Sequence, residues 1–274
     1  MKQTLFIGDF RFREFHSTVD CLKSHSWLAL AIDVEDAIIR VEKQRLSPDL
    51  IVLGQAHPGQ FTRAAVERLH RSAPLARLVA VLGSWCESET RTGYPWPGVL
   101  RVYWHQFPAR MDWAFLQGAA GGPWDLPRTS SDAERILTGS MPAAETAEHR
   151  LVVIRACGLI AYQALADALN AAGYATTWTA ENQHPFVSGH WAGIWDCGMH
   201  EFDGVSELTH FSLCLQPAPV IALKNFPRPQ DCRRLLSGGA TAVLGKPFAV
   251  GDLLGLLGPR SGDRPEATRN AFAA

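Results

Sequence analysis

Two acids and a lysine in the second half of the chain stand where apolar segments end. The segment Gly193-Ile-Trp runs directly into Asp196, an Asp-Gly turn follows at Asp203-Gly204, and a later apolar segment ends in Lys246-Pro247-Phe248. Short apolar runs of this kind are typical of buried parallel strands. Because doubly wound parallel sheets bind ligands at the carboxyl ends of their strands, Asp196, Asp203 and Lys246 are candidate site residues.

The segments around these residues alternate between strand and helix patterns in both halves of the chain. In the first half, strands are expected at residues 4–8, 27–32, 48–53, 76–82 and 98–104, and helices at 13–24, 34–44 and 61–69. In the second half, strands are expected at residues 150–154, 174–180, 193–196, 219–223 and 242–245, and helices at 160–172, 231–236 and 252–257. Such alternation predicts parallel sheets with right-handed crossover connections.

A change of composition separates the two halves. Residues 118–148 are rich in Gly, Pro, Ser and Ala and are predicted to form a linker, and residues 259–274 are predicted to form a disordered tail. Residues 1–117 and 149–258 are then expected to form one domain each. A chain of 274 residues with 47% apolar side chains is long enough for two such cores.

Each half resembles a receiver domain of the response-regulator family. The resemblance rests on the joint spacing of Asp196, Asp203-Gly204 and Lys246-Pro247-Phe248, and on residues 48–59 in the first half. It implies two flavodoxin-like domains in tandem, each a doubly wound, five-stranded parallel sheet of strand order 2-1-3-4-5. It also implies that Asp196 occupies the phospho-acceptor position and that Lys246 occupies the position of a lysine that neutralises the transferred phosphoryl group.

The second half departs from a working receiver at most of the other positions. Arg155 and Ala156 replace the acidic pair that would hold Mg²⁺, and Lys224 replaces a hydroxyl residue. Since the first and third strands are neighbours in the implied order, Arg155 is expected beside Asp196, where a guanidinium would take the place of a divalent ion and repel one. Our hypothesis is that Asp196 is a structural anion held by Arg155 and Lys246, with Lys224 nearby. The alternative is an atypical receiver that a histidine kinase still phosphorylates at Asp196.

The first half departs further. By the same resemblance the acceptor position holds Gly54, Asp9 follows the first strand, Gly83 follows the fourth, and His105 stands in place of the lysine. A glycine has no oxygen to which a phosphoryl group could be transferred. This half is therefore expected to have no receiver chemistry.

An aromatic segment lies between the fourth and fifth strands of the first half, where receivers have a helix. Its aromatic residues include Trp85, Tyr94 and Trp96, with Trp104 shortly beyond, and its prolines exclude a long regular helix. Two interpretations remain open. These rings either cover the edge of the sheet in place of the helix, or form a surface that binds a partner protein.

Composition narrows the functional classes. The net charge is −1 and no basic region points to nucleic acid, no apolar run is long enough to span a membrane, and six scattered cysteines favour reduced thiols in the cytoplasm. Dinucleotide, P-loop and nucleophile-elbow motifs are absent from the sequence, and no cofactor or metal site is expected. The sequence therefore predicts a non-catalytic signalling protein, acting through partner proteins or a second copy of itself. A small-ligand sensor or an enzyme with its site at the strand ends is the remaining alternative.

Overall fold

The computed structural model describes residues 3–89, 96–116, 130, 150–179, 189–196 and 204–258. The chain divides between residues 139 and 140 into two compact units, here called unit 1 and unit 2. The expected linker, apart from Ser130, and the expected tail lie outside the described residues. No helix of the described ranges is long and apolar enough to cross a membrane.

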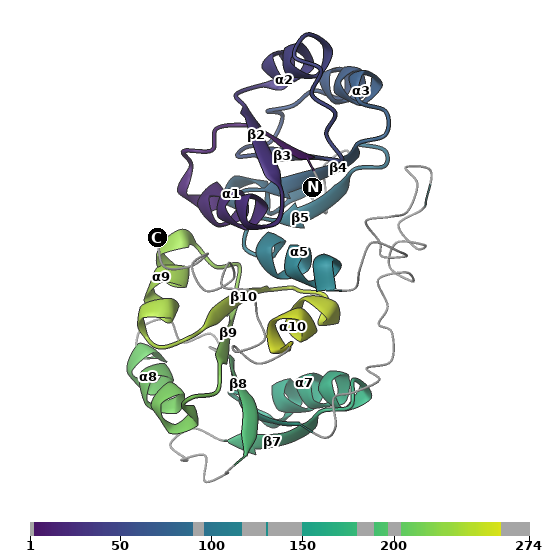
Figure 1. The fold of residues 1–274 in the computed structure, drawn as a ribbon. Helices are drawn as coiled ribbons and strands as arrows, with labels where there is room; N and C mark the ends of the chain where they lie inside the picture. The colour runs from purple at the N-terminus through teal and green to yellow at the C-terminus, as the bar shows by residue number, and fades with distance from the viewer. Residues whose placement is uncertain are drawn as a thin grey trace. The chain divides into compact units, whose positions relative to one another are not determined.

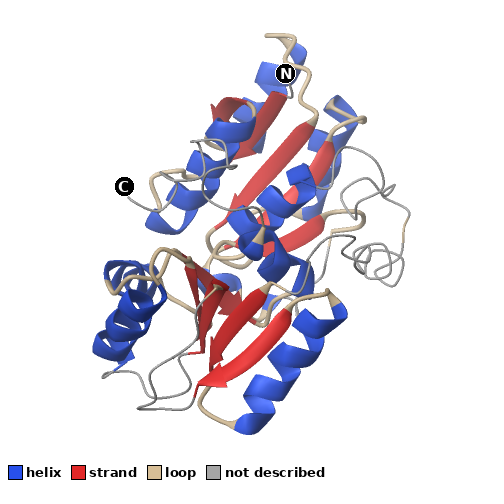
Figure 2. Ribbon diagram, turned by 60° about the horizontal axis from the view of Figure 1, so that its bottom comes forward, coloured by secondary structure: helices blue, strands red, loops and turns tan. Residues whose placement is uncertain are grey.

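Unit 1 is a five-stranded parallel sheet covered by helices on both faces (Figures 1 and 2). Its strands lie in the order β2-β1-β3-β4-β5. The elements along the chain are β1 (Gln3–Ile7), α1 (Arg13–His25), β2 (Trp27–Ala31), α2 (Val34–Glu42), β3 (Leu50–Gln55), α3 (Arg63–Ser72), β4 (Arg77–Leu82), the 3₁₀ turn η1 (Ser84–Cys86), β5 (Leu100–Tyr103) and α5 (Phe107–Leu116).

Unit 2 repeats this arrangement. Its strands lie in the order β10-β9-β8-β6-β7, which is the same order read from the opposite edge. The elements along the chain are β6 (Leu151–Arg155), α7 (Leu159–Ala171), β7 (Ala175–Thr179), β8 (His190–Asp196), α8 (Gly204–Leu215), β9 (Val220–Asn225), α9 (Pro229–Ser237), β10 (Ala242–Lys246) and α10 (Val250–Leu257). The predicted fold class, two flavodoxin-like domains of strand order 2-1-3-4-5, is confirmed by these two sheets.

The central strands are apolar throughout because both faces of each sheet are covered. In unit 1, α1 and α5 pack together on one face while α2 and α3 pack together on the other. In unit 2, α8 and α9 lie on one face, and α7 and α10 lie on the other (Figure 1). Side chains alternate between these faces along each strand, so the face of a strand-end residue follows from its register.

Local signals fix where the helices begin. The side chain of Asp33 accepts a hydrogen bond from the backbone N–H of Asp36 at 2.8 Å, and Thr62 does the same for Ala65 at 3.2 Å. These hydrogen bonds cap free N–H groups in the first turn of α2 and of α3.

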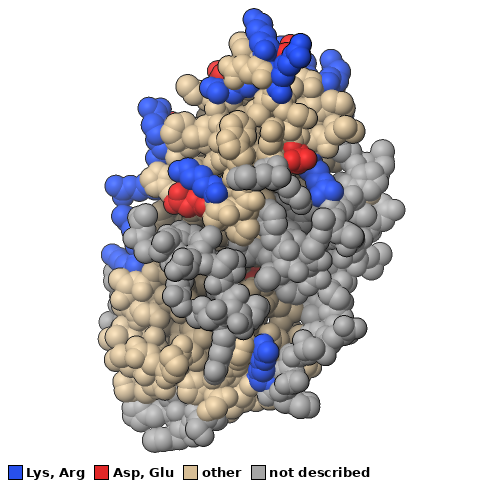
Figure 3. All heavy atoms as spheres, viewed as in Figure 1, with Lys and Arg blue, Asp and Glu red and all other residues tan. Residues whose placement is uncertain are grey.

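The face drawn in Figure 3 shows Lys and Arg side chains scattered among Asp and Glu over unit 1. The charge on this face is therefore mixed.

Candidate functional site

An ion pair joins two strand ends of unit 2. The ammonium of Lys246 donates a hydrogen bond to Oδ1 of Asp196 at 2.5 Å. The Asp196 side chain is 5% exposed and that of Lys246 is 29% exposed. Because the carboxylate is almost withdrawn from water, it depends on charged and hydrogen-bonding neighbours for the stabilisation that water would otherwise give. Lys246 is one such neighbour.

The strand register explains why these two side chains meet. Asp196 pairs with Leu223 of β9, Leu223 pairs with Leu244 of β10, and Lys246 lies two residues beyond Leu244. An even number of residues along a strand returns the side chain to the same face. Asp196 and Lys246 therefore project from the same face, and the long lysine side chain crosses β9 to reach the carboxylate.

Arg155 lies at the same edge of the sheet but on the other face. It pairs with Trp195, one residue before Asp196, and its Nη2 donates a hydrogen bond to Oε2 of Glu207 on α8 at 3.3 Å. Trp195 packs against α8 and α9, which identifies the face. The expected clamp of Arg155 on Asp196 gains no support from this geometry. The next residue, Ala156, is the one whose place in the alternation corresponds to the face of Asp196, and its side chain carries no charge.

Lys224 shares the face of Arg155 rather than that of Asp196, because it directly follows Leu223 in β9. The four charged strand-end side chains thus separate into two sets, Asp196 with Lys246 and Arg155 with Lys224. Sequence reasoning missed Glu207, the described partner of Arg155. Its position in the first turn of the helix that follows the third strand was the sequence signal that could have identified it. Asp203 lies outside the described residues.

In unit 1 the acceptor position is filled by aromatic rings. A Cβ atom placed on Gly54 would lie 2.5 Å from Cζ of Phe6 and 3.4 Å from Cε2 of Phe15, and the two rings pack edge to face. A Cβ on Gly8 would lie 2.7 Å from the carbonyl oxygen of Gly54, so the ends of β1 and β3 also approach closely. An aspartate cannot occupy this position unless the core rearranges.

The register corrects the counterpart of the lysine in unit 1. Gly54 pairs with Val81, and Val81 pairs with Val102 of β5, so the residue two positions further is Trp104. His105, which the sequence spacing placed there, lies one residue too far along the chain and on the other face. Trp104 is buried. Unit 1 therefore holds a glycine and a tryptophan where unit 2 holds its ion pair.

The same register assigns Leu82, rather than Gly83, to the position of Lys224, because each directly follows the residue paired with the acceptor position. Gly83 lies next to Glu14 of α1, whose Oε2 accepts a hydrogen bond from the backbone N–H of Ser84 at 2.9 Å. A Cβ on Gly83 would lie 2.5 Å from that oxygen. Gly83 therefore makes room for the carboxylate that anchors η1.

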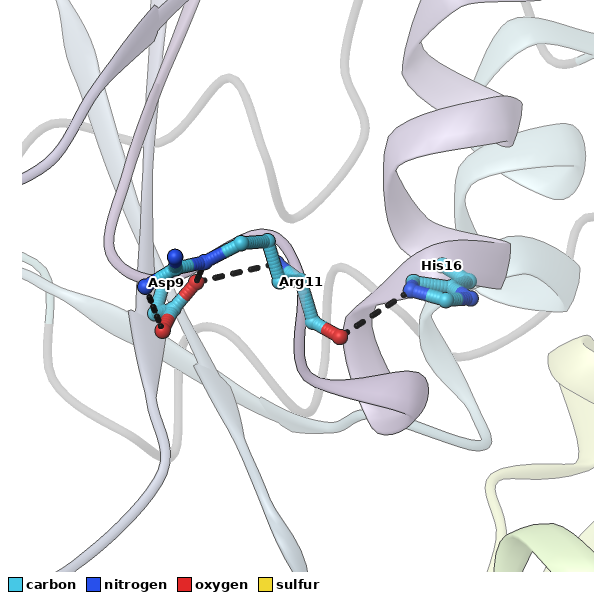
Figure 4. Close-up of polar contacts among 3 residues, drawn as sticks. All are labelled: Asp9, Arg11 and His16. Carbon is cyan, nitrogen blue, oxygen red and sulfur yellow. Dashed lines mark hydrogen bonds and ion pairs between the residues drawn. The ribbon is translucent and has the colours of Figure 1, made fainter.

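Asp9 is bound within its own loop (Figure 4). The guanidinium of Arg11 donates to both carboxylate oxygens, at 2.8 and 2.9 Å, and Nε2 of His16 lies 3.2 Å from the Arg11 carbonyl oxygen. The hydrogen bonds from Arg11 lower the pKa of Asp9 below its ordinary value. Asp9 is therefore paired with a cation of its own loop.

His105 is buried in an aromatic cluster. Its ring stacks on Tyr103 and meets Trp104 edge to face, and neither ring nitrogen has a hydrogen-bond partner in the described structure. Burial, with a contribution from the charge of Arg110, lowers the pKa of His105 to about 3. The imidazole is therefore neutral in the folded chain under ordinary conditions.

The four aromatic candidates for a partner surface have different surroundings. Trp104 is buried, and Trp96 packs edge to face on Phe61 and against the core of unit 1. Trp85, on η1, is 81% exposed. Tyr94 lies outside the described residues. Trp96 and Trp104 are thus packed within unit 1, whereas Trp85 is the exposed ring among the three that are described.

No family model and no curated protein matches the chain. Among solved structures, it is similar to the crystal structure of a putative two-component system response regulator/GGDEF domain protein, with 13% identity and a TM-score of 0.35 over 93% of this chain and 95% of that one. It is similar to the E. coli RcsC C-terminus, containing a linker region and phosphoreceiver domain, with 16% identity and a TM-score of 0.33 over 93% and 92%. It is also similar to an NAD-complexed D-isomer specific 2-hydroxyacid dehydrogenase from Lactobacillus delbrueckii ssp. bulgaricus, with 11% identity and a TM-score of 0.26 over 98% and 86%.

Replacing Gly54 with Ala is expected to lower the free energy of unfolding of unit 1 by about 1–3 kcal/mol, because the added methyl group overpacks a full core. Urea unfolding followed by circular dichroism measures this change. Gly158→Ser is the control. A Cβ at Gly158 meets nothing within 4 Å, and its extended backbone at the start of α7 suits a serine cap. A Gly54→Ala variant as stable as the control would show that the position is open.

Replacing Lys246 with Met is expected to lower the free energy of unfolding by about 1–3 kcal/mol, because it removes the ammonium that contacts the buried Asp196 carboxylate. Adding Asp196→Asn to this variant should restore part of the loss, since the buried side chain then carries no charge. A double-mutant cycle on urea unfolding measures the coupling. Lys224→Met, which removes a lysine without a described ion pair from the same edge, is the matched control. Equal losses for Lys224 and Lys246 would contradict a specific pair.

His105 should make the stability of unit 1 depend on pH. The unfolded chain binds a proton at this side chain below about pH 6.5, whereas the folded chain does not until its pKa near 3. The contribution is therefore complete above pH 6.5 and decreases as the pH falls toward 3, by at most about 1.4 kcal/mol per pH unit. Urea unfolding at pH 7 and pH 5 should show a smaller difference for His105→Phe than for the unaltered chain. The control is His57→Gln, at an exposed histidine, which should leave the change in free energy of unfolding between pH 7 and pH 5 as it is. If His105→Phe also leaves this change as it is, His105 is not the source of the pH dependence.

Proposed function

We propose that the chain is a non-catalytic signalling protein, built from two receiver-like units, that acts through protein contacts and does not depend on phosphorylation. The observation that carries this proposal is the filled acceptor position of unit 1. Phe6 stands 2.5 Å from where a Cβ of residue 54 would begin, so unit 1 has neither the acceptor nor the space for one. A receiver-like unit of this kind can serve as a binding surface but not as a phosphoryl acceptor.

Unit 2 supports the proposal through the residues around Asp196. A working receiver would need further carboxylates there to hold Mg²⁺, but the residues that follow β6 are Ala156 and Cys157. The described residues contain no group of three His, Cys, Asp or Glu side chains that could hold a metal ion. The ammonium of Lys246 already contacts Oδ1 of Asp196. This set of residues does not fit a magnesium ion, and Asp196 is better explained as a structural anion.

Protein contact is the remaining role, and Trp85 is the side chain best placed for it. A tryptophan that is 81% exposed on an anchored turn offers a large apolar area with little entropy to lose on binding. The turn is anchored by the buried Cys86, whose Sγ donates a hydrogen bond to the carbonyl oxygen of Gln55 at 3.4 Å. The partner is a second copy of the chain or another protein. The five described cysteines are free thiols.

One specific observation favours the alternative that Asp196 is still phosphorylated. Asp196 and Lys246 lie at the carboxyl ends of β8 and β10 with their charged groups in contact, which is the part of a receiver site that would neutralise a transferred phosphoryl group. A kinase that supplies its own catalytic groups would need only this acceptor. The two functions differ in whether Asp196 becomes covalently modified.

Incubation with acetyl phosphate and Mg²⁺, followed by intact mass spectrometry, separates the two functions. We expect the unaltered chain to keep its mass, because no described carboxylate joins Asp196 to hold the metal ion. Asp196→Asn is the control for labelling at other side chains. Stoichiometric labelling of the unaltered chain that disappears in Asp196→Asn would establish the alternative in place of the proposed function.

A further inference from the structure

Arg155 is a buried cation with little hydrogen bonding. Its side chain is 8% exposed, and among the described residues the hydrogen bond of its guanidinium is the one to Glu207, at 3.3 Å. A guanidinium carries five N–H donors and cannot lose its charge in a protein. The described buried side-chain atoms that lack a hydrogen-bond partner include no nitrogen of Arg155, so its other N–H donors are not cut off from water. Arg155 therefore has capacity for a second acceptor.

Glu207 is a weak holder of this cation. Its side chain is 44% exposed, so water screens its charge and its long side chain loses entropy in the pair. The carboxylate can turn out into water without any other described hydrogen bond being broken. An anion that accepts two N–H bonds from Arg155 would be a better partner than this single long contact.

Two further sources of positive potential lie on the same face. Lys224 is half-buried two residues beyond Ala222, which pairs with Trp195, the neighbour of Arg155. The first residue of α8 lies against the indole of Trp195, where a Cβ on Gly204 would be 2.7 Å from Cη2. The positive end of a twelve-residue helix is thus held over this face.

We propose that Arg155 and Lys224 form an anion-binding site on the α8 and α9 face of unit 2, whose ligand is a phosphate group, free or as a small monoester. Glu207 is the internal counter-ion, which moves away when the ligand binds. The charges are complementary, since two cations face a dianion once the glutamate has left. The site lies on the face opposite Asp196 and Lys246. It is independent of the proposed function, because neither of those residues takes part.

Titration calorimetry with inorganic phosphate, at constant ionic strength set with sodium chloride, tests the site. The unaltered chain should bind phosphate, and Glu207→Gln should bind it about three- to tenfold more tightly, because the competing carboxylate is gone. Lys224→Met should weaken binding by a similar factor, and Arg155→Lys should weaken it more, because the two-pronged contact is lost. Arg233→Met, which removes an exposed positive charge from α9, is the matched control and should change nothing.

Glu207 and Lys224 are not fully buried, so their variants should fold, and circular dichroism verifies this. A glycerol phosphate arm distinguishes a monoester from free phosphate as the preferred ligand. Absence of phosphate binding, or a Glu207→Gln variant that binds no more tightly than the unaltered chain, would overturn the site. Equal effects of Lys224→Met and Arg233→Met would reduce it to general charge attraction, which also overturns it. Labelling of Asp196 by acetyl phosphate would leave these outcomes unchanged.

Discussion

Which charges meet at the ends of a parallel sheet depends on the alternation of side chains between its two faces. Unit 2 carries Arg155, Asp196, Lys224 and Lys246 at or near the carboxyl ends of neighbouring strands, an arrangement that suggests a single cluster. The register divides them, so that Asp196 contacts Lys246 on one face and Arg155 contacts Glu207 on the other. A shift of β8 by one residue would move Asp196 to the face of Arg155 and away from Lys246. The chemistry open to unit 2 therefore follows from its strand pairing.

The same constraint gives a different result in unit 1, although its sheet has the same strand order. The positions that hold Asp196 and Lys246 in unit 2 hold Gly54 and Trp104 there. Phe6 fills the space in front of the glycine, and the buried tryptophan replaces the lysine. One fold thus accommodates an ion pair in one unit and apolar packing in the other, at corresponding positions.

The sequence predicted the two parallel sheets, because apolar strand segments are local signals, whereas the strand order and the meeting of Asp196 with Lys246 were implied by the resemblance to receiver domains. The sequence could not predict which face of the sheet Arg155 projects from, because the strand order alone does not determine the register between neighbouring strands. His105 was placed one residue away from the correct position for the same reason. Trp85 and Trp104 belong to similar aromatic segments, and only the folded chain separates the exposed ring from the buried one.

The comparison of the two units bears on why unit 2 keeps charges at all. A buried ion pair is seldom more stabilising than well-packed apolar groups of similar volume, since both ions must leave water. Unit 1 demonstrates that this fold forms with apolar groups at the same two positions. Stability of the fold alone thus does not account for Asp196 and Lys246. The pair places a buried carboxylate and a partly exposed ammonium at the strand ends of unit 2, where unit 1 has a glycine and a buried tryptophan.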